Sequence, residues 1–235
     1  MQKAYYVEKL YPFQDGIISM LKGLDTGFYL TGGTVLSRAF FHHRFSDDLD
    51  FFCHEEPDFQ ERVQRILDQV HFSGWCKVSE QVPFQLDSDF SRVFLERVPS
   101  FGVPMLKMDF VNDVGKHLGK IIQHPVLGTI DNLENILVNK LTALGRYEPK
   151  DVADTWIIAK NSSFCWKERF LQARQKDLGV TPEESACILK GFPIPFFEKV
   201  QWQQPPNRET FFQELSRIAS DMLKGEENHL ALEKR

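Results

Sequence analysis

The sequence predicts an α+β fold in which a mixed sheet occupies the first half and helices occupy the second. Up to about residue 130, short apolar runs end at turn residues, as strands and their loops do. Beyond that point, apolar residues recur at helical spacing. The length of 235 residues and the hydrophobic content of 42% suit one core-bearing domain with a smaller one attached. We therefore expect an α+β domain at residues 1–130 and a helical domain at residues 131–235.

The first half is expected to alternate helices with strands. Val7, Leu10 and Ile17 have helical spacing, which predicts a helix at residues 7–24. Residues 28–30 form a short apolar run that stops near two glycines, as a strand does when it enters a turn. The other elements expected here, in chain order, are a helix at 34–41, a strand at 48–53, a helix at 58–70, strands at 76–82 and 90–98 with a turn at 85–89, and strands at 104–111 and 120–127.

The second half is expected to be helical throughout. Apolar residues spaced for one helix face recur along it, and the sequence contains neither an internal repeat nor a low-complexity tract. The expected helices are at 132–146, 151–160, 166–177, 182–190 and 208–223. Four prolines, at positions 193, 195, 205 and 206, predict a loop-rich stretch between the last two helices.

The charge and the cysteine pattern limit the classes of function. The formal net charge is −5, whereas a protein that binds nucleic acid over its whole surface is usually basic, although a local basic groove is compatible with this balance. The N-terminus has no apolar signal-peptide core, and no run of about 18 apolar residues predicts a membrane span. The four cysteines lack the spacing of zinc or redox motifs. We expect a cytoplasmic protein with reduced thiols and no membrane contact.

An Asp-x-Asp pair is the most informative feature of the sequence. Residues two apart in a strand share a face, so Asp48 and Asp50 project together while Leu49 faces the other way. Adjacent carboxylates repel unless a cation lies between them, and hard oxygen ligands suit Mg²⁺, with Mn²⁺ as the alternative. The competing interpretation is a pair of ordinary strand-end carboxylates, which applies to Asp47 because it is out of phase with the other two.

A third aspartate is expected to join this pair. Asp109 lies in an apolar run, where a charge is costly unless it is paired or bound to a metal ion. If its strand is adjacent to the first, Asp48, Asp50 and Asp109 converge. Three convergent carboxylates are what phosphoryl transfer with two metal ions requires.

A glycine-rich loop precedes the aspartates. Gly32, Gly33 and Thr34 join a strand to a helix, where glycines allow close backbone approach and helix amides point at an anion. Arg44 and Ser46 come just before the aspartates and are expected to contact triphosphate oxygens or to orient Asp48. An ordinary turn also explains a pair of glycines, but the order of loop, helix and Asp-x-Asp strand favours a nucleoside triphosphate site.

One lysine falls on an apolar helix face. Lys140 follows Ile136 and Leu137 on the stripe of its helix, a position where lysine rarely occurs without a partner. Either its ammonium reaches water along the side-chain stem, or it turns towards a bound triphosphate. On the second interpretation, Lys140→Met weakens nucleotide binding with little loss of thermal stability.

Taken together, these motifs resemble those of the AbiEii/AbiGii-type toxin nucleotidyltransferases. The resemblance covers about residues 28–160. It rests on the loop at 31–34, the Arg-x-Ser-Asp-Asp-x-Asp run at 44–50, Lys107-Met108-Asp109, the helix segment 139–146 around Lys140, and Lys150-Asp151-Val152-Ala153-Asp154. Many related enzymes have Gly-Ser at the loop, whereas here Thr34 follows two glycines.

The resemblance implies a polymerase-β-like nucleotidyltransferase domain with a mixed sheet, followed by a helical C-terminal domain. It implies that Asp48, Asp50 and Asp109 bind Mg²⁺, that the loop and Lys140 contact the nucleoside triphosphate, and that Asp154 has a catalytic or positioning role. Several family members are toxins of toxin–antitoxin or phage-defence systems, and some add nucleotides to transfer RNA. An RNA such as tRNA or a protein is therefore the expected acceptor, and an antitoxin encoded alongside is an expected partner.

Two other functions are compatible with the motifs. A small-molecule nucleotidyltransferase of the antibiotic-modifying type would need an acidic pocket in the second half, suited to a cationic drug. A nucleotide-binding module without catalysis would be expected to have lost a metal ligand, whereas Asp48, Asp50 and Asp109 are all present.

Overall fold

The computed structural model describes residues 2–99, 102, 105–113 and 115–232. The described residues form two compact units. The first comprises those within 1–40 and 45–132, and the second comprises 41–44 together with those within 133–235. A short segment between the glycine-rich loop and the Asp-x-Asp pair therefore belongs to the helical unit rather than to the sheet unit.

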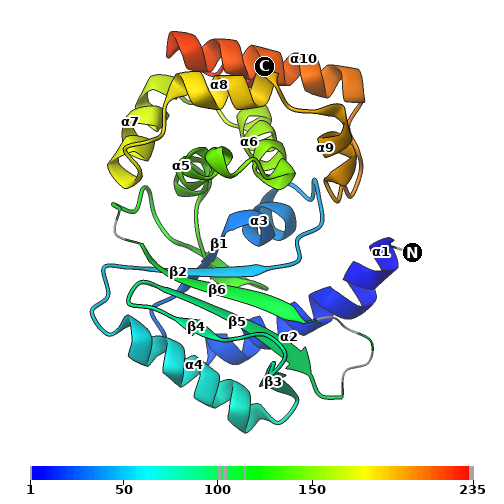
Figure 1. The fold of residues 1–235 in the computed structure, drawn as a ribbon, viewed down its shortest axis with the longest axis vertical. Coiled ribbons are helices and arrows are strands. Elements are labelled where there is room, and N and C mark those ends of the chain that lie inside the picture. Colours follow the sequence, from blue (N-terminus) through cyan, green and yellow to red (C-terminus); the bar gives the residue numbers. More distant parts are fainter. Residues whose placement is uncertain (1, 100–101, 103–104, 114, 233–235) are drawn as a thin grey trace. The chain divides into compact units, whose positions relative to one another are not determined.

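Eight described strands of the first unit form one mixed sheet (Figure 1). Strand β2 runs parallel to β6, and β1 runs parallel to β8, while the other pairs are antiparallel. From edge to edge the strands are β3 (Cys76–Val78), β5 (Phe90–Arg97), β6 (Leu106–Asp113), β2 (Leu49–His54), β1 (Tyr29–Thr31), β8 (Gly128–Ile130) and β7 (Ile122–His124), with β4 (Gln85–Leu86) paired to β5. The expected α+β class with a mixed sheet is confirmed.

Helices cover both faces of this sheet, with α2 and α4 on one side and α3 on the other (Figure 1). The first helical run comprises α1 (Gln2–Tyr5), the π-helical η1 (Tyr6–Leu10) and α2 (Tyr11–Lys22); the others are α3 (Gly32–Val35) with the π-helical η2 (Leu36–Phe40), and α4 (Phe59–Ser73). On the α4 side, Phe28 contacts Phe59 and Phe110, and Phe51 stacks on Phe110. This aromatic core fixes which face of β2 and β6 is buried against α4 and leaves the alternate residues for the opposite face.

One expected strand of the first half is two strands in the structure. Residues 120–127 contain only β7, and β8 begins at Gly128, where the expected strand ends. Gly128 has a φ of +75° and begins the returning arm of a hairpin, so the glycine marks a turn within the pair. The expected turn at 85–89 also contains the short strand β4. The expected strand at 104–111 is β6, and its first residue, 104, lies outside the described residues.

The second unit is built from helices. They are α5 (Leu133–Ala143), the 3-10 turn η3 (Leu144–Arg146), α6 (Pro149–Asn161), α7 (Trp166–Lys176), α8 (Pro182–Lys190), α9 (Ile194–Lys199), α10 (Arg208–Lys224) and α11 (His229–Leu232). Side chains cap two of them at the N-terminus, because Thr181 accepts a hydrogen bond from Glu184 N and Asn207 accepts one from Thr210 N. A core of aromatic residues, including Trp156, Trp202 and Phe211, packs edge to face inside the unit.

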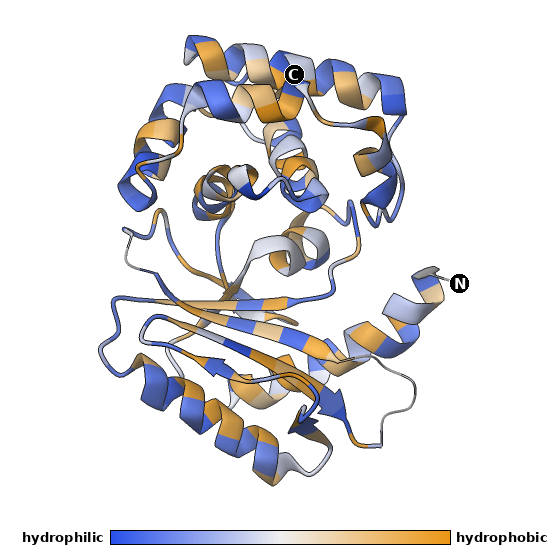
Figure 2. Cartoon of the chain, in the orientation of Figure 1, coloured by the Kyte–Doolittle hydropathy of each residue, from blue (hydrophilic) through white to orange (hydrophobic). Residues whose placement is uncertain are grey.

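Helix α9 lies where the sequence predicts a loop. Proline breaks the interior of a helix but is tolerated in its first turn, and Pro195 occupies that position in α9. The buried Phe197 of this helix packs against Trp202 and Phe211, so tertiary contacts stabilise a helix of only six residues. Figure 2 shows polar and apolar residues mixed along the long helices. Within the described ranges, none of the helices has the length and apolarity needed to cross a membrane.

Candidate active site

The Asp-x-Asp pair and the third aspartate lie on neighbouring strands. Parallel pairing of β2 with β6 sets Asp50 directly opposite Asp109, and paired residues of adjacent strands share a face. Leu49 and Phe51 are buried on the other face. The expectation that the two strands run side by side is therefore confirmed. Asp48 precedes the strand by one residue and continues the same alternation.

A lysine side chain lies between two of these carboxylates. Lys107 Nζ is 2.9 Å from Asp48 Oδ2 and 3.3 Å from Asp109 Oδ2. Burial alone would lower the pKa of Lys107, but its hydrogen bond to Asp48 and the charges of Asp48, Asp109 and Asp50 raise it above its usual value. The ammonium therefore stays protonated and compensates the carboxylates on this face.

Asp109 is also held by an arginine from the next strand. Arg92 of β5 is paired with Asp109 and donates two parallel hydrogen bonds, Nε to Oδ1 and Nη2 to Oδ2, each 2.7 Å long. Burial alone would raise the pKa of Asp109, but the Arg92 hydrogen bond and the Lys107 charge hold it below its usual value. Asp109 is consequently an ionised carboxylate, which is the state that a metal ligand requires.

The glycine-rich loop comes into close contact with Asp50. Thr31, at the end of β1, is paired with Asp50 of β2, and the chain then enters α3 at Gly32. Gly32 has a φ of +69°, and a Cβ built on it would lie 2.6 Å from Asp50 Oδ2. Glycine is required here for both reasons, because the left-handed conformation and the close approach exclude a side chain. The loop and the Asp-x-Asp strand, which the sequence predicts in that order, are thus in direct contact in the fold.

Thr34 and Ser46 tie the loop to the segment before β2. Thr34 is fully buried, and its hydroxyl donates to the carbonyl oxygen of Asp48 at 2.5 Å and lies 3.0 Å from Ser46 Oγ. Gln14 of α2 holds the same segment by donating to the carbonyl oxygens of Ser46 and Asp47. The Thr34 hydroxyl therefore ties the loop to the backbone of Asp48 and to the side chain of Ser46.

A buried carboxylate that the sequence did not single out supports the loop from behind. Asp131 is fully buried and accepts hydrogen bonds from Thr31 Oγ1 at 2.7 Å and from Asn132 N at 2.8 Å. His117 Nε2 lies 3.1 Å from Asp131 Oδ1, and the His117 ring contacts Tyr29 edge to face. The residue preceding the glycines is thus anchored by a charged hydrogen-bond acceptor.

The helical unit contains a second cluster of charges around Asp154. This carboxylate is 0% exposed and accepts two parallel hydrogen bonds from Arg44, Nε to Oδ1 and Nη2 to Oδ2, each 2.7 Å long. His43 Nε2 lies 2.8 Å from Asp154 Oδ1. Burial alone would raise the pKa of Asp154, but the charges of Arg44 and Lys140 and the hydrogen bonds from His43 and Arg44 hold it well below its usual value.

Lys140 belongs to the same cluster. Its ammonium is 2.7 Å from Asp151 Oδ1 and 2.8 Å from Asp154 Oδ2, and the residue is 9% exposed. The lysine on the apolar stripe is therefore buried with two carboxylate partners, and it does not reach open water along its stem. Arg44 and Lys140 both pair with Asp154, so the sequence-predicted residues Arg44, Lys140 and Asp154 meet in one ion-pair network.

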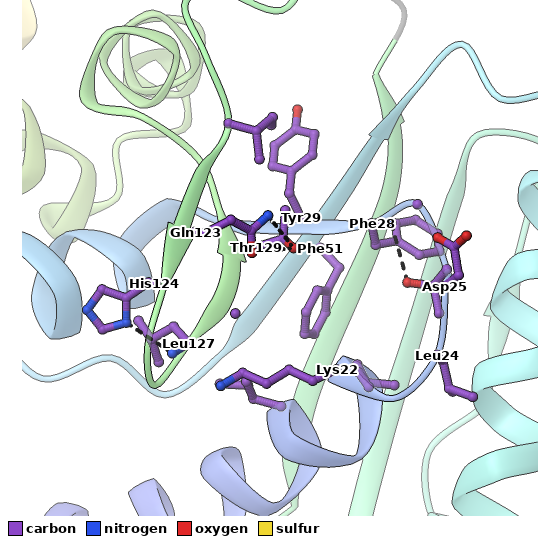
Figure 3. A pocket seen from close by; sticks show the side chains of 16 residues that line it. Lys22, Leu24, Asp25, Phe28, Tyr29, Phe51, Gln123, His124, Leu127 and Thr129 are labelled. Carbon is purple, nitrogen blue, oxygen red and sulfur yellow. Dashed lines mark hydrogen bonds between the residues drawn. The ribbon is translucent and has the colours of Figure 1, made fainter.

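A large cavity of the first unit lies away from the aspartates. It has a volume of about 520 Å³ and is formed by α2, the loop after it, β1 and the β7–β8 hairpin (Figure 3). Phe51, Lys22 and Leu127 are among its lining residues, whereas Asp48, Asp50 and Asp109 are not. Since Phe51 points to the face opposite Asp50, this cavity and the carboxylates occupy different faces of the sheet.

The sheet site fits a divalent cation by its chemistry. Mg²⁺ and Mn²⁺ prefer carboxylate oxygens, which Asp48, Asp50 and Asp109 supply on one face of the sheet. A cationic ammonium already lies between Asp48 and Asp109. Among the described residues, three His, Cys, Asp or Glu side chains with ligand atoms within 4.8 Å of one another occur at the end of α10, at Asp221, Glu226 and His229. The sheet aspartates are spaced more widely, around Lys107.

Four contributors to these sites were missed at the level of sequence. Lys107 and Arg92 lie at the positions between buried strand residues, a signal that marks them as facing the aspartates once the register is known. Asp131 follows a strand and His43 lies in a loop, and no spacing pattern links either to its partner. Their partners are about 100 residues away in the chain, at Thr31 and Asp154.

Two solved structures resemble the chain over its full length. The crystal structure of JHP933 from Helicobacter pylori gives a TM-score of 0.56 at 21% identity, covering 100% of this chain and 96% of that one. The crystal structure of a putative nucleotidyltransferase from H. pylori gives a TM-score of 0.57 at 20% identity, with coverage of 100% and 99%. An uncharacterized protein of Aquifex aeolicus (strain VF5) is 26% identical over 196 residues, which make up 82% of this chain and 84% of that protein.

The fold and the arrangement of carboxylates and loop define the chain as a nucleotidyltransferase, and the expected nucleotidyltransferase fold is confirmed. The family described as "Nucleotidyl transferase AbiEii toxin, Type IV TA system" matches residues 19–227. The chain belongs to this AbiEii family, as the resemblance seen in the sequence implied. It is therefore an enzyme of a family whose members are nucleotidyl transferase toxins of type IV toxin–antitoxin systems.

Proposed function

We propose that the enzyme transfers a nucleoside monophosphate from a nucleoside triphosphate to a macromolecular acceptor, with a divalent cation held by Asp48, Asp50 and Asp109. The observation that carries this proposal is the register of β2 and β6, which sets Asp50 opposite Asp109 beside the backbone of Gly32. Carboxylates beside a glycine-rich loop are suited to the metal and the phosphates of one substrate. Mg²⁺ is the proposed ion and Mn²⁺ the alternative.

The proposed reaction is an in-line displacement at the α-phosphorus. An acceptor hydroxyl oxygen bonds to this phosphorus, the bond to the bridging oxygen breaks, and pyrophosphate leaves. The bound cation neutralises phosphate charge and makes the hydroxyl more acidic. Gly32, Gly33 and Thr34 bring backbone amides to the phosphates, and Thr34, in contact with Ser46, holds the backbone at Asp48. Arg92 keeps the Asp109 carboxylate ionised and oriented.

The charged cluster of the helical unit has a proposed role of its own. An ammonium has three N–H donors, and Asp151 and Asp154 accept two of those of Lys140. We propose that the remaining donor of Lys140 serves a phosphate oxygen, and that Asp154 acts as a positioning residue for Lys140 and Arg44. On this proposal Arg44 acts through the network around Asp154, since two of its donors are directed at that carboxylate.

The proposed acceptor is RNA, such as tRNA, with protein as the alternative that the test must distinguish. Negative charge is concentrated in the sheet unit, with 12 Lys and Arg against 18 Asp and Glu. The helical unit has 16 Lys and Arg against 15 Asp and Glu, so the net charge of −5 does not describe its surface. We further propose that an antitoxin encoded alongside counteracts the enzyme, as the family's type IV systems imply.

The decisive experiment asks which fraction of a cell extract becomes labelled. The full chain is incubated with each radiolabelled nucleoside triphosphate, total RNA or lysate protein, and Mg²⁺, Mn²⁺ or a chelator. We expect label in the RNA fraction, dependent on the divalent cation. Label in the protein fraction alone would replace RNA by protein as the acceptor, and label that persists in chelator would overturn the metal assignment.

Asp50→Asn tests the site itself. We expect transfer to fall by roughly 10³-fold or more, the order lost with a charge-stabilising group in phosphoryl transfer, while the melting temperature does not fall. Asp47→Asn is the matched control, because Asp47 is exposed and its carboxylate accepts a hydrogen bond from Tyr6. Undiminished transfer by Asp50→Asn would contradict the proposed mechanism.

The cavity of about 350 Å³ in the helical unit does not favour the antibiotic-modifying alternative. This alternative requires an acidic pocket, and the cavity has aromatic and apolar walls with one carboxylate side chain, Glu184. A polycationic drug needs several carboxylates to replace its hydration. A macromolecular acceptor therefore remains the proposal.

A further inference from the structure

The cavity of about 350 Å³ in the helical unit has a chemistry that none of the roles above uses. Its volume lies within the range of roughly 300–1,000 Å³ that is usual for ligand sites. It opens between the turn after α5, the helix α8 and the start of α9. The walls that matter here are Tyr147, Glu184, Cys187, Phe192, Pro193 and Phe196.

Aromatic rings dominate these walls. Tyr147 is 60% exposed although it lines a cavity, and its backbone has the left-handed conformation with a φ of +57°. A bulky residue seldom adopts this conformation, and here it follows from the position of Tyr147 at the end of η3, where its N–H donates to Leu144 O. Phe192 and Phe196 form a T-shaped pair on the other wall, with centroids 6.1 Å apart. Such surfaces favour a flat unsaturated ring, which stacks on aromatic faces.

One carboxylate is placed at the edge of this aromatic cavity. Glu184 lies in the first turn of α8 and lines both this cavity and a neighbouring one of about 230 Å³. An ionised glutamate only accepts hydrogen bonds, so it selects a ligand with N–H donors on its edge. The neighbouring cavity adds the hydroxyl residues Thr142 and Ser185. A ring with exocyclic amino or imino groups can donate hydrogen bonds to Glu184, whereas a hydrocarbon ring cannot.

A basic side chain lies against the aromatic walls. Lys199 Nζ lies 4.8 Å from the ring centroid of Phe196, and the exposed Arg146 and Lys190 are the sequence neighbours of the lining residues Tyr147 and Gly191. A cation beside an aromatic cavity complements a ligand whose ring is attached to phosphate. An uncharged aromatic side chain would fill the walls but would offer no group to Lys199 or to Glu184.

We propose that this cavity binds a nucleobase of single-stranded RNA and thereby holds the acceptor. The proposal rests on the proposed function, because it assigns the acceptor site of that reaction. Val152 lines the cavity and directly follows Asp151, the partner of Lys140, so the first turn of α6 joins the base-binding cavity to the charged cluster. A phosphate flanking the bound base contacts Lys199, and Glu184 accepts a hydrogen bond from the edge of the base.

Binding of short single-stranded RNA to aromatic variants tests the proposal. Fluorescein-labelled oligonucleotides of each base are titrated with the full chain, without triphosphate, and the dissociation constant is obtained from fluorescence anisotropy. Tyr147→Leu and Phe196→Leu keep apolar bulk but remove ring stacking, and each should weaken binding roughly fivefold or more. Phe72→Leu is the control, since Phe72 is 79% exposed on α4 of the sheet unit. Parent-like binding by both cavity variants would overturn the proposal.

Cysteine modification gives a second readout that does not depend on catalysis. Cys187 is an exposed thiol in the cavity wall, and Cys165, which is partly exposed at the N-cap of α7 and does not line the cavity, serves as an internal control. Single-stranded RNA should slow N-ethylmaleimide modification of Cys187 and leave that of Cys165 unchanged, as measured by peptide mass spectrometry. Protection of Cys187 by an aromatic peptide but not by RNA would assign the cavity to a protein partner and overturn the proposal.

Asp50→Asn separates this proposal from the proposed function. The variant should lose transfer yet bind RNA and protect Cys187 as the parent does. If Asp50→Asn keeps full transfer, the metal mechanism fails, whereas the cavity is still judged by RNA binding. If Tyr147→Leu transfers label to RNA with an unchanged KM, the acceptor site lies elsewhere and this inference fails while the mechanism stands.

Discussion

At the scale of single residues, the ammonium of Lys107 lies between the carboxylates of Asp48 and Asp109 and offsets the repulsion between them. It contacts both carboxylates, and Arg92 holds Asp109 from the other side. Two cations therefore offset three clustered aspartates on one face of the sheet. A divalent cation bound there would compete with the lysine for the same oxygens.

Lys107→Met is predicted to raise the affinity for a divalent cation. The substitution keeps the length of the side chain and removes the charge that competes for Asp48 and Asp109. Mn²⁺ titration followed by electron paramagnetic resonance should show a dissociation constant several-fold lower than that of the parent. Lys77→Met is the control, because Lys77 is a half-exposed lysine of the same sheet that pairs with Glu96. Weaker Mn²⁺ binding by Lys107→Met would show that the lysine assists the metal site instead of competing with it.

The residue scale also revises the expectation for Lys140. A lysine on an apolar stripe suggested a missing anionic ligand, and Lys140→Met was expected to cost little stability. The structure gives the ammonium two buried carboxylate partners, Asp151 and Asp154. Lys140→Met would remove the ammonium that compensates the buried carboxylates of Asp151 and Asp154. The expected loss of stability is therefore large. A role at the nucleotide has to be tested by binding measurements on folded protein.

At the scale of elements, the link between β1 and α3 determines how the glycine-rich loop meets Asp50. The loop leaves β1 at Thr31, which is anchored by Asp131, and it turns at Gly32 against the side chain of Asp50 on β2. The antiparallel register of β1 with β2 sets this contact. A loop of the same composition on another strand would not reach the carboxylate.

Gly32→Ala compared with Gly74→Ala tests this contact. Both glycines have a positive φ, +69° and +71°, so each alanine should cost about 1–2 kcal/mol of stability. A Cβ at Gly32 meets Asp50 Oδ2 at 2.6 Å, while a Cβ at Gly74 meets nothing within 4 Å. We expect a loss of unfolding free energy in both variants, larger in Gly32→Ala, and loss of transfer only in Gly32→Ala. Equal transfer by both variants would mean that the loop does not control Asp50.

At the scale of the whole molecule, residues 41–44 belong to the helical unit although both flanking segments belong to the sheet unit. Their place is set by side chains, because His43 and Arg44 bind Asp154, and by backbone, because Arg44 forms a bridge with Trp202. Buried charges of this kind stabilise a fold only while they remain paired. The cohesion of the helical unit therefore depends on Asp154.

Asp154→Asn is predicted to loosen the helical unit and to leave the sheet intact. Removing one partner from a buried ion pair costs about 3–5 kcal/mol. Hydrogen exchange should rise in residues 41–44, α5 and α6, while β2 and β6 keep their protection. Asp15→Asn, which removes a more exposed partner of Arg38, should change stability by less than about 1 kcal/mol. Equal loss of protection in β2 and β6 would contradict the division into units with separate stability.

Much of the local structure was predictable because it depends on neighbours in the chain. Helix α8 has the predicted bounds, and the strands that carry Asp50 and Asp109 lie where alternation of apolar residues predicts them. Helix α9 and the second strand that begins at Gly128, just after the strand expected at 120–127, were not predictable in this way. In α9, packing of Phe197 outweighs the local preference of a proline-rich stretch.

The sequence by itself determined the class of the enzyme, since spaced aspartates, a glycine-rich loop and their order in the chain identify it without coordinates. Only the tertiary structure decided the partners of those residues. It paired Asp50 with Asp109, brought Lys107 and Arg92 to them, and enclosed Lys140 with Asp154. The physical reason is that side-chain type is encoded locally, whereas a charge finds its partner through strand register and helix packing across tens to more than a hundred residues.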